Sequence, residues 1–96
     1  MAQAIAKSGT EPHLLVVEDE EALVILLRYN LEREGYQVSV AMDGDDAIYM
    51  AEAIEPDLIL LDWMLPGRSG LSICREIRAH KTLKKTPIIM VTELVV

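Results

Sequence analysis

The sequence predicts a doubly wound α/β fold, in which a parallel sheet lies between two layers of helices. Four short runs of the chain are mainly apolar, and they alternate with three segments whose apolar residues recur at helical spacing. Strands that are apolar throughout indicate a parallel sheet with both faces covered, and right-handed crossovers then place helices on either side. A length of 96 residues limits this fold to one small domain.

The first strand and helix follow a polar lead-in. Residues 1–12 are small and polar, and we interpret them as a flexible N-terminal tail. The apolar run His13–Val17 predicts a buried strand. Residues 22–34 carry leucines at helical spacing, and Gly35 supplies the C-terminal stop of the predicted helix.

The second unit and the third strand continue the alternation. Gln37–Ala41 is a short apolar-rich run and predicts the second strand. Residues 46–54 predict a helix, with Asp45 as its N-terminal cap. Residues 57–62 are apolar between their two terminal aspartates, so they predict a third strand, of the kind found in a parallel sheet covered on both faces.

The last part of the chain completes the pattern. Residues 63–69 contain proline and glycine and predict a loop, and residues 70–80 show an apolar face at helical spacing. Residues 81–86 form a basic loop, and residues 87–91 predict a fourth strand. The predicted order is therefore strand and helix in alternation, ending on a strand.

Composition excludes several classes of protein. The net charge of -7 argues against binding of a nucleic-acid backbone by this domain, since such binding needs clustered positive charge. A single cysteine, Cys74, excludes a disulfide framework, and we expect it to be a core thiol. No apolar run is long enough to cross a bilayer, and the N-terminus lacks the pattern of a signal peptide. We therefore expect a cytoplasmic protein that binds neither nucleic acid nor membrane.

Acidic side chains and one hydroxyl follow three of the predicted strands. Glu18 and Asp19 end the first strand, Asp62 ends the third and Thr92 ends the fourth. Ligand sites of open parallel sheets lie at the carboxyl ends of the strands, so these groups should converge. Carboxylate oxygens suit Mg²⁺, and one carboxylate beside such an ion could attack a phosphorus atom and become an aspartyl phosphate.

A structural interpretation of the same residues is also open. Acidic residues after a strand often stabilise the N-terminus of the next helix, and Glu18 and Asp19 precede a predicted helix. A threonine after a strand is commonly an ordinary loop residue. Asp62 is harder to explain in this way, because the segment that follows it, WMLP, offers no helix to cap.

Three segments together resemble the receiver domains of two-component response regulators, and most closely the OmpR/PhoB subfamily. They are VVEDE at residues 16–20, DLILLDWMLPGRSG at residues 57–70 and PIIMVT at residues 87–92. The resemblance implies a flavodoxin-like (CheY-like) three-layer fold with sheet order 2-1-3-4-5. It also implies a signalling module rather than an enzyme, which takes a phosphoryl group from a histidine kinase and controls transcription in a full-length parent.

The resemblance implies a role for each residue of the site. Asp62 is expected to be the phosphoacceptor. Glu18 and Asp19, together with Asp62 and the backbone carbonyl of Met64, are expected to hold Mg²⁺. Thr92 is expected to be the switch hydroxyl that moves toward the phosphoryl group.

Residues 13–96 are shorter than a complete member of this family. We expect the domain to lack the fourth helix, the fifth strand and the fifth helix, and with them the family's lysine and switch aromatic. The edge of the fourth strand and parts of both sheet faces would then be exposed, which favours a homo-oligomer. Two alternatives remain open: a signalling-impaired interaction or oligomerisation module, and, more remotely, a Mg²⁺-dependent phosphohydrolase.

Overall fold

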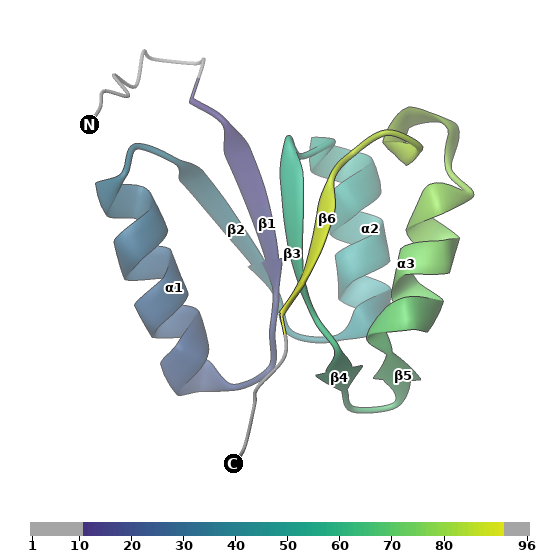
Figure 1. Ribbon diagram of the computed structural model, residues 1–96, viewed down its shortest axis with the longest axis horizontal. Coiled ribbons are helices and arrows are strands. Elements are labelled where there is room, and N and C mark those ends of the chain that lie inside the picture. The colour runs from purple at the N-terminus through teal and green to yellow at the C-terminus, as the bar shows by residue number, and fades with distance from the viewer. Residues whose placement is uncertain (1–10, 92–96) are drawn as a thin grey trace.

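The computed structural model describes residues 11–91 and shows a four-stranded parallel sheet with helices on both faces (Figure 1). The order of the strands across the sheet is β2-β1-β3-β6, and each neighbouring pair is parallel. The doubly wound α/β architecture is therefore confirmed. The strands of this sheet are β1 (His13–Val17), β2 (Gln37–Ala41), β3 (Leu58–Asp62) and β6 (Ile88–Val91).

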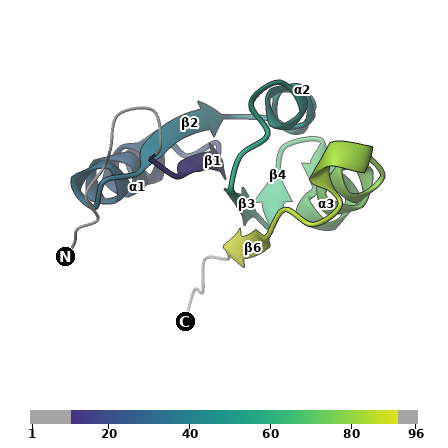
Figure 2. The same ribbon diagram turned by 90° about the horizontal axis from the view of Figure 1, so that it is seen from above.

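Three α-helices connect these strands, and all three predicted helices are confirmed with ends shifted by one or two residues. Helix α1 spans Glu21–Arg33, α2 spans Gly44–Ile54 and α3 spans Gly70–Arg78. Seen from above, α1 lies on one face of the sheet, while α2 and α3 lie on the other (Figure 2). Within residues 11–91, no helix is both long and apolar enough to cross a membrane.

Two segments that were predicted to be loops contain short regular structure. Between β3 and α3, β4 (Met64–Leu65) and β5 (Arg68–Ser69) form a small antiparallel hairpin. The turn of this hairpin contains Gly67 with φ 81°, a backbone conformation that glycine adopts without strain. Between α3 and β6, residues Lys81–Leu83 form a 3₁₀ helix, η1.

The main core lies between the sheet and helices α2 and α3. Successive strand residues point to opposite faces, so alternate residues of β1 and β3 enter this core. Ala47 and Ala51 are fully buried, and their small side chains let α2 approach the sheet closely. Each fully buried leucine or isoleucine contributes about 1.5–3 kcal/mol. The largest of these side chains are Leu15, Ile59, Leu61, Ile73, Ile77 and Leu83.

Residues 11–91 cover the opposite face of the sheet only in part. Helix α1 packs against β2 at one side of this face (Figure 2). On β3 and β6 the alternate residues that point away from the main core are apolar: Leu58 and Leu60 are half-buried, and Ile89 is 50% exposed. No other helix of residues 11–91 lies over them. This face therefore presents an apolar strip on β3 and the edge strand β6, formed by Leu58, Leu60 and Ile89.

The N-terminal cap of α2 differs from the prediction. The structure places Asp43 at the cap, where its Oδ1 accepts a hydrogen bond of 2.8 Å from the backbone N–H of Asp46. Asp45, the predicted cap, lies inside the first turn, and its carboxylate faces Arg68 instead. The prediction was wrong because the helix begins at Gly44, two residues earlier than expected.

Replacing Asp43 with Ala should lower the free energy of unfolding by about 1 kcal/mol, because the first turn of α2 loses the acceptor for one of its free N–H groups. Urea denaturation followed by circular dichroism measures this change. Asp43→Ser keeps a capping oxygen and should retain most of the stability. Equal losses in both variants would contradict the capping role.

Candidate metal and phosphoryl site

Three carboxylates meet at the carboxyl edge of the sheet. Glu18 and Asp19 directly follow β1, and Asp62 is the last residue of the neighbouring strand β3. One oxygen atom from each residue lies within 4.8 Å of the other two. The structure thus brings together the three acidic residues that the sequence analysis selected, and it does so because β1 and β3 are parallel and adjacent.

Glu18 is the buried member of this cluster. Only 5% of the residue is exposed, and its backbone N–H donates to the carbonyl of Ala41 at 3.0 Å. Burial raises the pKa of the Glu18 carboxyl above its ordinary value of 4.5, and repulsion from Asp62 and Asp19 acts in the same direction. A hydrogen bond of 3.0 Å from the backbone N–H of Glu20 to Oε2 of Glu18 opposes this shift. The negative charge of Glu18 therefore lowers the free energy of unfolding when no cation is bound.

Asp62 is half-buried, and its backbone surroundings are fixed. Its Oδ1 accepts a hydrogen bond of 3.2 Å from the backbone N–H of Met64. The N–H of Trp63 donates to the carbonyl of Val91 at 3.0 Å, which ties the end of β3 to β6. The end of β3 is therefore held by β6, and one oxygen of the Asp62 carboxylate lies within 4.8 Å of oxygens of Glu18 and Asp19.

Gly70 is a structural determinant of the site that residue patterns did not reveal. Its N–H donates to the carbonyl of Trp63 at 2.8 Å, which brings the start of α3 against the end of β3. A Cβ atom on Gly70 would lie 2.8 Å from the backbone oxygen of Asp62 and 3.1 Å from Cα of Trp63. Only a residue without a side chain fits here. The sequence analysis predicted a helix that begins at residue 70, but the close approach to Asp62 could only be seen in three dimensions.

The cluster suits a small divalent cation. Mg²⁺ takes oxygen ligands at about 2.0–2.1 Å in an octahedron, so opposite ligand oxygens lie about 4 Å apart and neighbouring ones about 3 Å. Three oxygens within 4.8 Å of one another need only a small contraction to reach this spacing. A cation would also relieve the burial and repulsion that raise the pKa of Glu18. The donor set, all carboxylate oxygen, fits Mg²⁺ or Mn²⁺.

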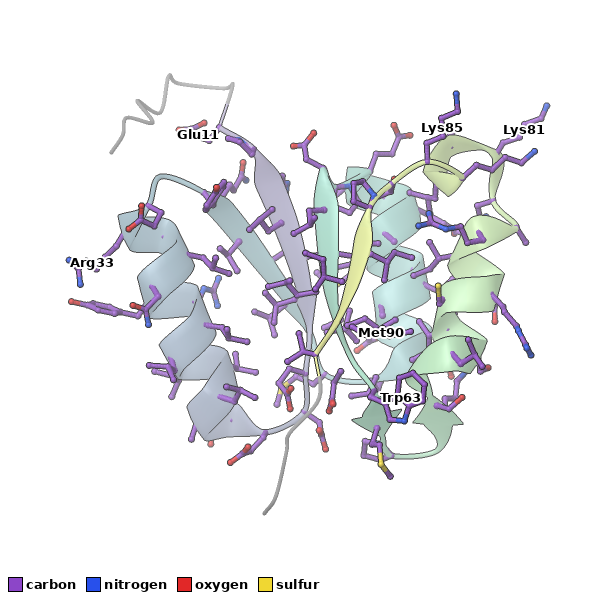
Figure 3. All side chains as sticks on the ribbon, viewed as in Figure 1. Glu11, Arg33, Trp63, Lys81, Lys85 and Met90 are labelled. Atoms are coloured by element: carbon purple, nitrogen blue, oxygen red, sulfur yellow. The ribbon has the colours of Figure 1, made fainter. Side chains whose placement is uncertain are left out.

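Other residues singled out in the sequence are placed as follows. Thr92 and residues 1–10 of the expected tail lie outside the described residues. Cys74 is partly buried and packs against the main core, as expected of a core thiol. The basic loop predicted over residues 81–86 contains Lys81 and Lys85, which lie at the opposite end of the sheet from Trp63 (Figure 3). Trp63 directly follows Asp62 of the acidic cluster.

Replacing Glu18 with Gln should stabilise the metal-free protein at neutral pH. The folded-state pKa of Glu18 is raised, so its favourable contribution to stability is complete below about 4.5 and is lost as the pH rises through the folded-state pKa. At pH 7 the neutral Gln avoids this loss, and we expect its Tm to be higher by about 2–5 °C. Near pH 4 the two proteins should unfold at similar temperatures.

Thermal unfolding in the presence of EDTA, at pH 7 and at pH 4, measures this effect. Glu21→Gln is the matched control, since Glu21 is exposed and begins α1. A Glu18→Gln variant that is less stable than the parent at pH 7 would contradict the assigned cost of the buried charge.

Comparisons with known proteins place this chain in a family. Residues 14–95 match the response regulator receiver domain. The chain is 52% identical over 81 residues to the phosphate regulon transcriptional regulatory protein PhoB of Rhizobium meliloti, and this match covers 84% of the chain and 36% of that protein. It is 51% identical over 79 residues to the alkaline phosphatase synthesis transcriptional regulatory protein PhoP of Bacillus subtilis, covering 82% of the chain and 32% of that protein. The chain therefore spans about a third of the length of these relatives.

Solved structures agree with the fold. The chemotaxis response regulator CheY4 of Vibrio cholerae superimposes with a TM-score of 0.85 at 29% identity, over 91% of this chain and 72% of that one. The receiver domain of the sensor histidine kinase PA1611 of Pseudomonas aeruginosa, solved with a magnesium ion in its active-site cleft, gives a TM-score of 0.81 at 36% identity, over 84% of this chain and 66% of that one. The predicted CheY-like fold and the similarity to the OmpR/PhoB subfamily are confirmed. The chain belongs to the family of response regulator receiver domains.

Proposed function

We propose that this domain accepts a phosphoryl group on Asp62 from the phosphohistidine of a histidine kinase, with Mg²⁺ bound by the acidic cluster. The observation that carries this proposal is the convergence of one oxygen each from Glu18, Asp19 and Asp62 within 4.8 Å at the carboxyl edge of the sheet. Membership of the receiver family supports it, as does a structural neighbour that holds magnesium in its cleft.

In the proposed reaction, a carboxylate oxygen of Asp62 attacks the phosphorus atom of the donor. The new O–P bond forms as the P–N bond to the imidazole breaks, and the imidazole nitrogen keeps the electron pair and takes a proton from solvent. Glu18 and Asp19 would hold Mg²⁺ beside Asp62, and the bound ion would supply positive charge that neutralises the phosphoryl oxygens. The hydrogen bond from Met64 N–H to Oδ1 of Asp62 orients the nucleophile.

Two further groups are assigned roles within this proposal. The backbone carbonyl of Met64 would add a neutral ligand to the cation, which does not depend on its side chain. The hydroxyl of Thr92 would donate a hydrogen bond to a phosphoryl oxygen. The PhoB and PhoP relatives are transcriptional regulatory proteins. We therefore place the module in the cytoplasm, as the input domain of a longer transcriptional regulator.

The kind of phosphoryl compound that reacts with the chain distinguishes the proposed function from that of a phosphohydrolase. With Mg²⁺ and phosphoramidate, a small donor with the P–N bond of phosphohistidine, the chain should gain one phosphoryl group. With p-nitrophenyl phosphate, a phosphoester, we expect no multiple turnover. Repeated turnover of the phosphoester would contradict the proposal and favour the hydrolase alternative.

A second candidate function is self-association, and the apolar strip on β3 and β6 favours it. Leu58 and Leu60 are half-buried there and Ile89 is 50% exposed. The outer edge of β6 pairs with no other strand of residues 11–91. We propose that a second copy of this chain covers the strip. This would make the chain an interaction module even if phosphorylation were weak.

Replacing Ile89 with Glu should then dissociate the dimer, because a charge would be buried at its centre. Size-exclusion chromatography with light scattering measures the mass. Tyr49→Glu is the matched control, since Tyr49 is 72% exposed on α2 and remote from the strip. A parent chain that stays monomeric at high concentration would contradict the proposal of self-association.

A further inference from the structure

Arg68 joins three parts of the structure around the site. It lies in β5 of the small hairpin that follows Asp62, and its side chain is only 26% exposed. One guanidinium nitrogen donates to Glu76 at 2.7 Å and to Ser72 Oγ at 3.0 Å, both on α3. The other terminal nitrogen donates to Asp45 of α2 at 3.4 Å. One side chain thus connects the hairpin with both α2 and α3.

The stem of Arg68 also has a fitted place. It crosses over Gly44 at the start of α2, and a Cβ atom built on Gly44 would lie 3.0 Å from Cδ of Arg68. Gly44 is buried although it begins a surface helix. The arginine is therefore held by packing along its stem as well as by hydrogen bonds at its head, which limits its conformational freedom.

The hairpin held by Arg68 carries groups of the candidate site. Arg68 pairs with Leu65 across the hairpin, and the neighbouring pair is Met64 with Ser69. Met64 N–H donates to Oδ1 of Asp62. Next along the chain, Ser69 caps α3 by accepting from Ser72 N–H at 3.1 Å. A shift of β5 would therefore move the backbone on which the Asp62 carboxylate is oriented.

We propose that Arg68 is a positioning residue, which clamps the β4–β5 hairpin between α2 and α3 and so holds Met64 and Asp62 in the arrangement that binds Mg²⁺. This inference rests on the proposed function, because it assigns Arg68 a role in the affinity of that site. The inference extends the proposed function to a residue outside the acidic cluster, in strand β5 of the hairpin.

If Arg68 acted only through its charge, its removal would change the Mg²⁺ affinity in the opposite direction. Arg68 is a cation, so its removal would leave the region more negative and would strengthen Mg²⁺ binding. Loss of the clamp would loosen the hairpin and weaken binding. The sign of the change in affinity therefore separates positioning from electrostatics, and Lys at this position keeps the charge while losing the two-armed contact with α2 and α3.

The test measures Mg²⁺ affinity by Trp63 fluorescence in the parent chain, in Arg68→Gln and in Arg68→Lys. The control is Arg75→Gln, which removes an exposed cation from α3, the helix that Arg68 contacts. We expect Arg68→Gln to bind about three- to tenfold more weakly, with Arg68→Lys intermediate. Arg75→Gln should bind as the parent does or slightly more tightly. Unchanged or tighter binding in Arg68→Gln would overturn the proposal.

Amide hydrogen exchange in EDTA gives a second readout that does not depend on metal binding. In Arg68→Gln the N–H groups of Met64 and Gly70 should exchange faster, while amides of β1 remain as protected as in the parent. If the parent itself failed to bind Mg²⁺, the proposed function would fail, and this exchange measurement would still decide whether Arg68 clamps the hairpin. Unchanged exchange at both amides would overturn the clamp.

Discussion

Replacing Asp19 with Asn is expected to lower the affinity for Mg²⁺ by about 100-fold, the upper end of the losses seen when groups around a metal site are changed. Asp19 is exposed at the end of β1, and it supplies one of the three clustered carboxylate oxygens. Asn keeps the shape and one oxygen but removes the negative charge, which is the property that a hard divalent cation requires most. The variant should also be phosphorylated far more slowly at limiting Mg²⁺.

Titration of Trp63 fluorescence measures this loss, since Trp63 is 46% exposed and directly follows Asp62. Asp46→Asn is the matched control, because it makes the same chemical change at an exposed position in the first turn of α2. That variant should bind Mg²⁺ about as the parent does. Equal Mg²⁺ affinities in Asp19→Asn and the parent would contradict the assignment of Asp19 as a metal ligand.

Replacing Gly70 with Ala should lower the free energy of unfolding by about 2–3 kcal/mol, because the added methyl group meets backbone that cannot move independently. The methyl carbon would lie 2.8 Å from the carbonyl oxygen of Asp62 and 3.1 Å from the carbonyl oxygen of Trp63. Relief of these contacts requires α3 to move away from the end of β3. The hydrogen bond from Gly70 N–H to Trp63 would lengthen, and Mg²⁺ affinity would fall with it.

Urea denaturation and a Mg²⁺ titration together measure the two effects. Gly67→Ala is an informative control, because a Cβ atom there meets nothing within 4 Å but would occupy a left-handed backbone conformation. This variant should lose about 1–2 kcal/mol of stability through backbone strain alone. Its Mg²⁺ affinity should change little. A Gly70→Ala variant with the stability and affinity of the parent would contradict the close contact.

The sequence was sufficient to predict the four strands of the main sheet, because each is a short apolar run bounded by turn residues. It also predicted the meeting of Glu18, Asp19 and Asp62, since residues at the carboxyl ends of adjacent parallel strands must share an edge. In both cases short stretches of sequence identify the strands and the residues at their ends, and the regular geometry of a parallel sheet determines which of these residues meet.

The hairpin β4–β5 could not be predicted in the same way. Its strands have two residues each, too few for a periodic pattern. They are held by contacts distant in sequence, such as that of Arg68 with Asp45, 23 residues away. The predicted cap of α2 was wrong for a related reason. The segment contains Asp43, Asp45 and Asp46, and only the position of the first helical turn decides which of them caps the helix.

The most direct test of the central claim is the intact mass of the chain after incubation with acetyl phosphate. With Mg²⁺ we expect one added phosphoryl group per chain, which EDTA prevents and hydroxylamine removes, as it should for an acyl phosphate. Asp62→Asn should remain unmodified, while Asp46→Asn should be modified like the parent. Addition of a phosphoryl group to Asp62→Asn, or Mg²⁺ binding by the parent without any phosphorylation, would contradict the assignment of Asp62 as the phosphoacceptor.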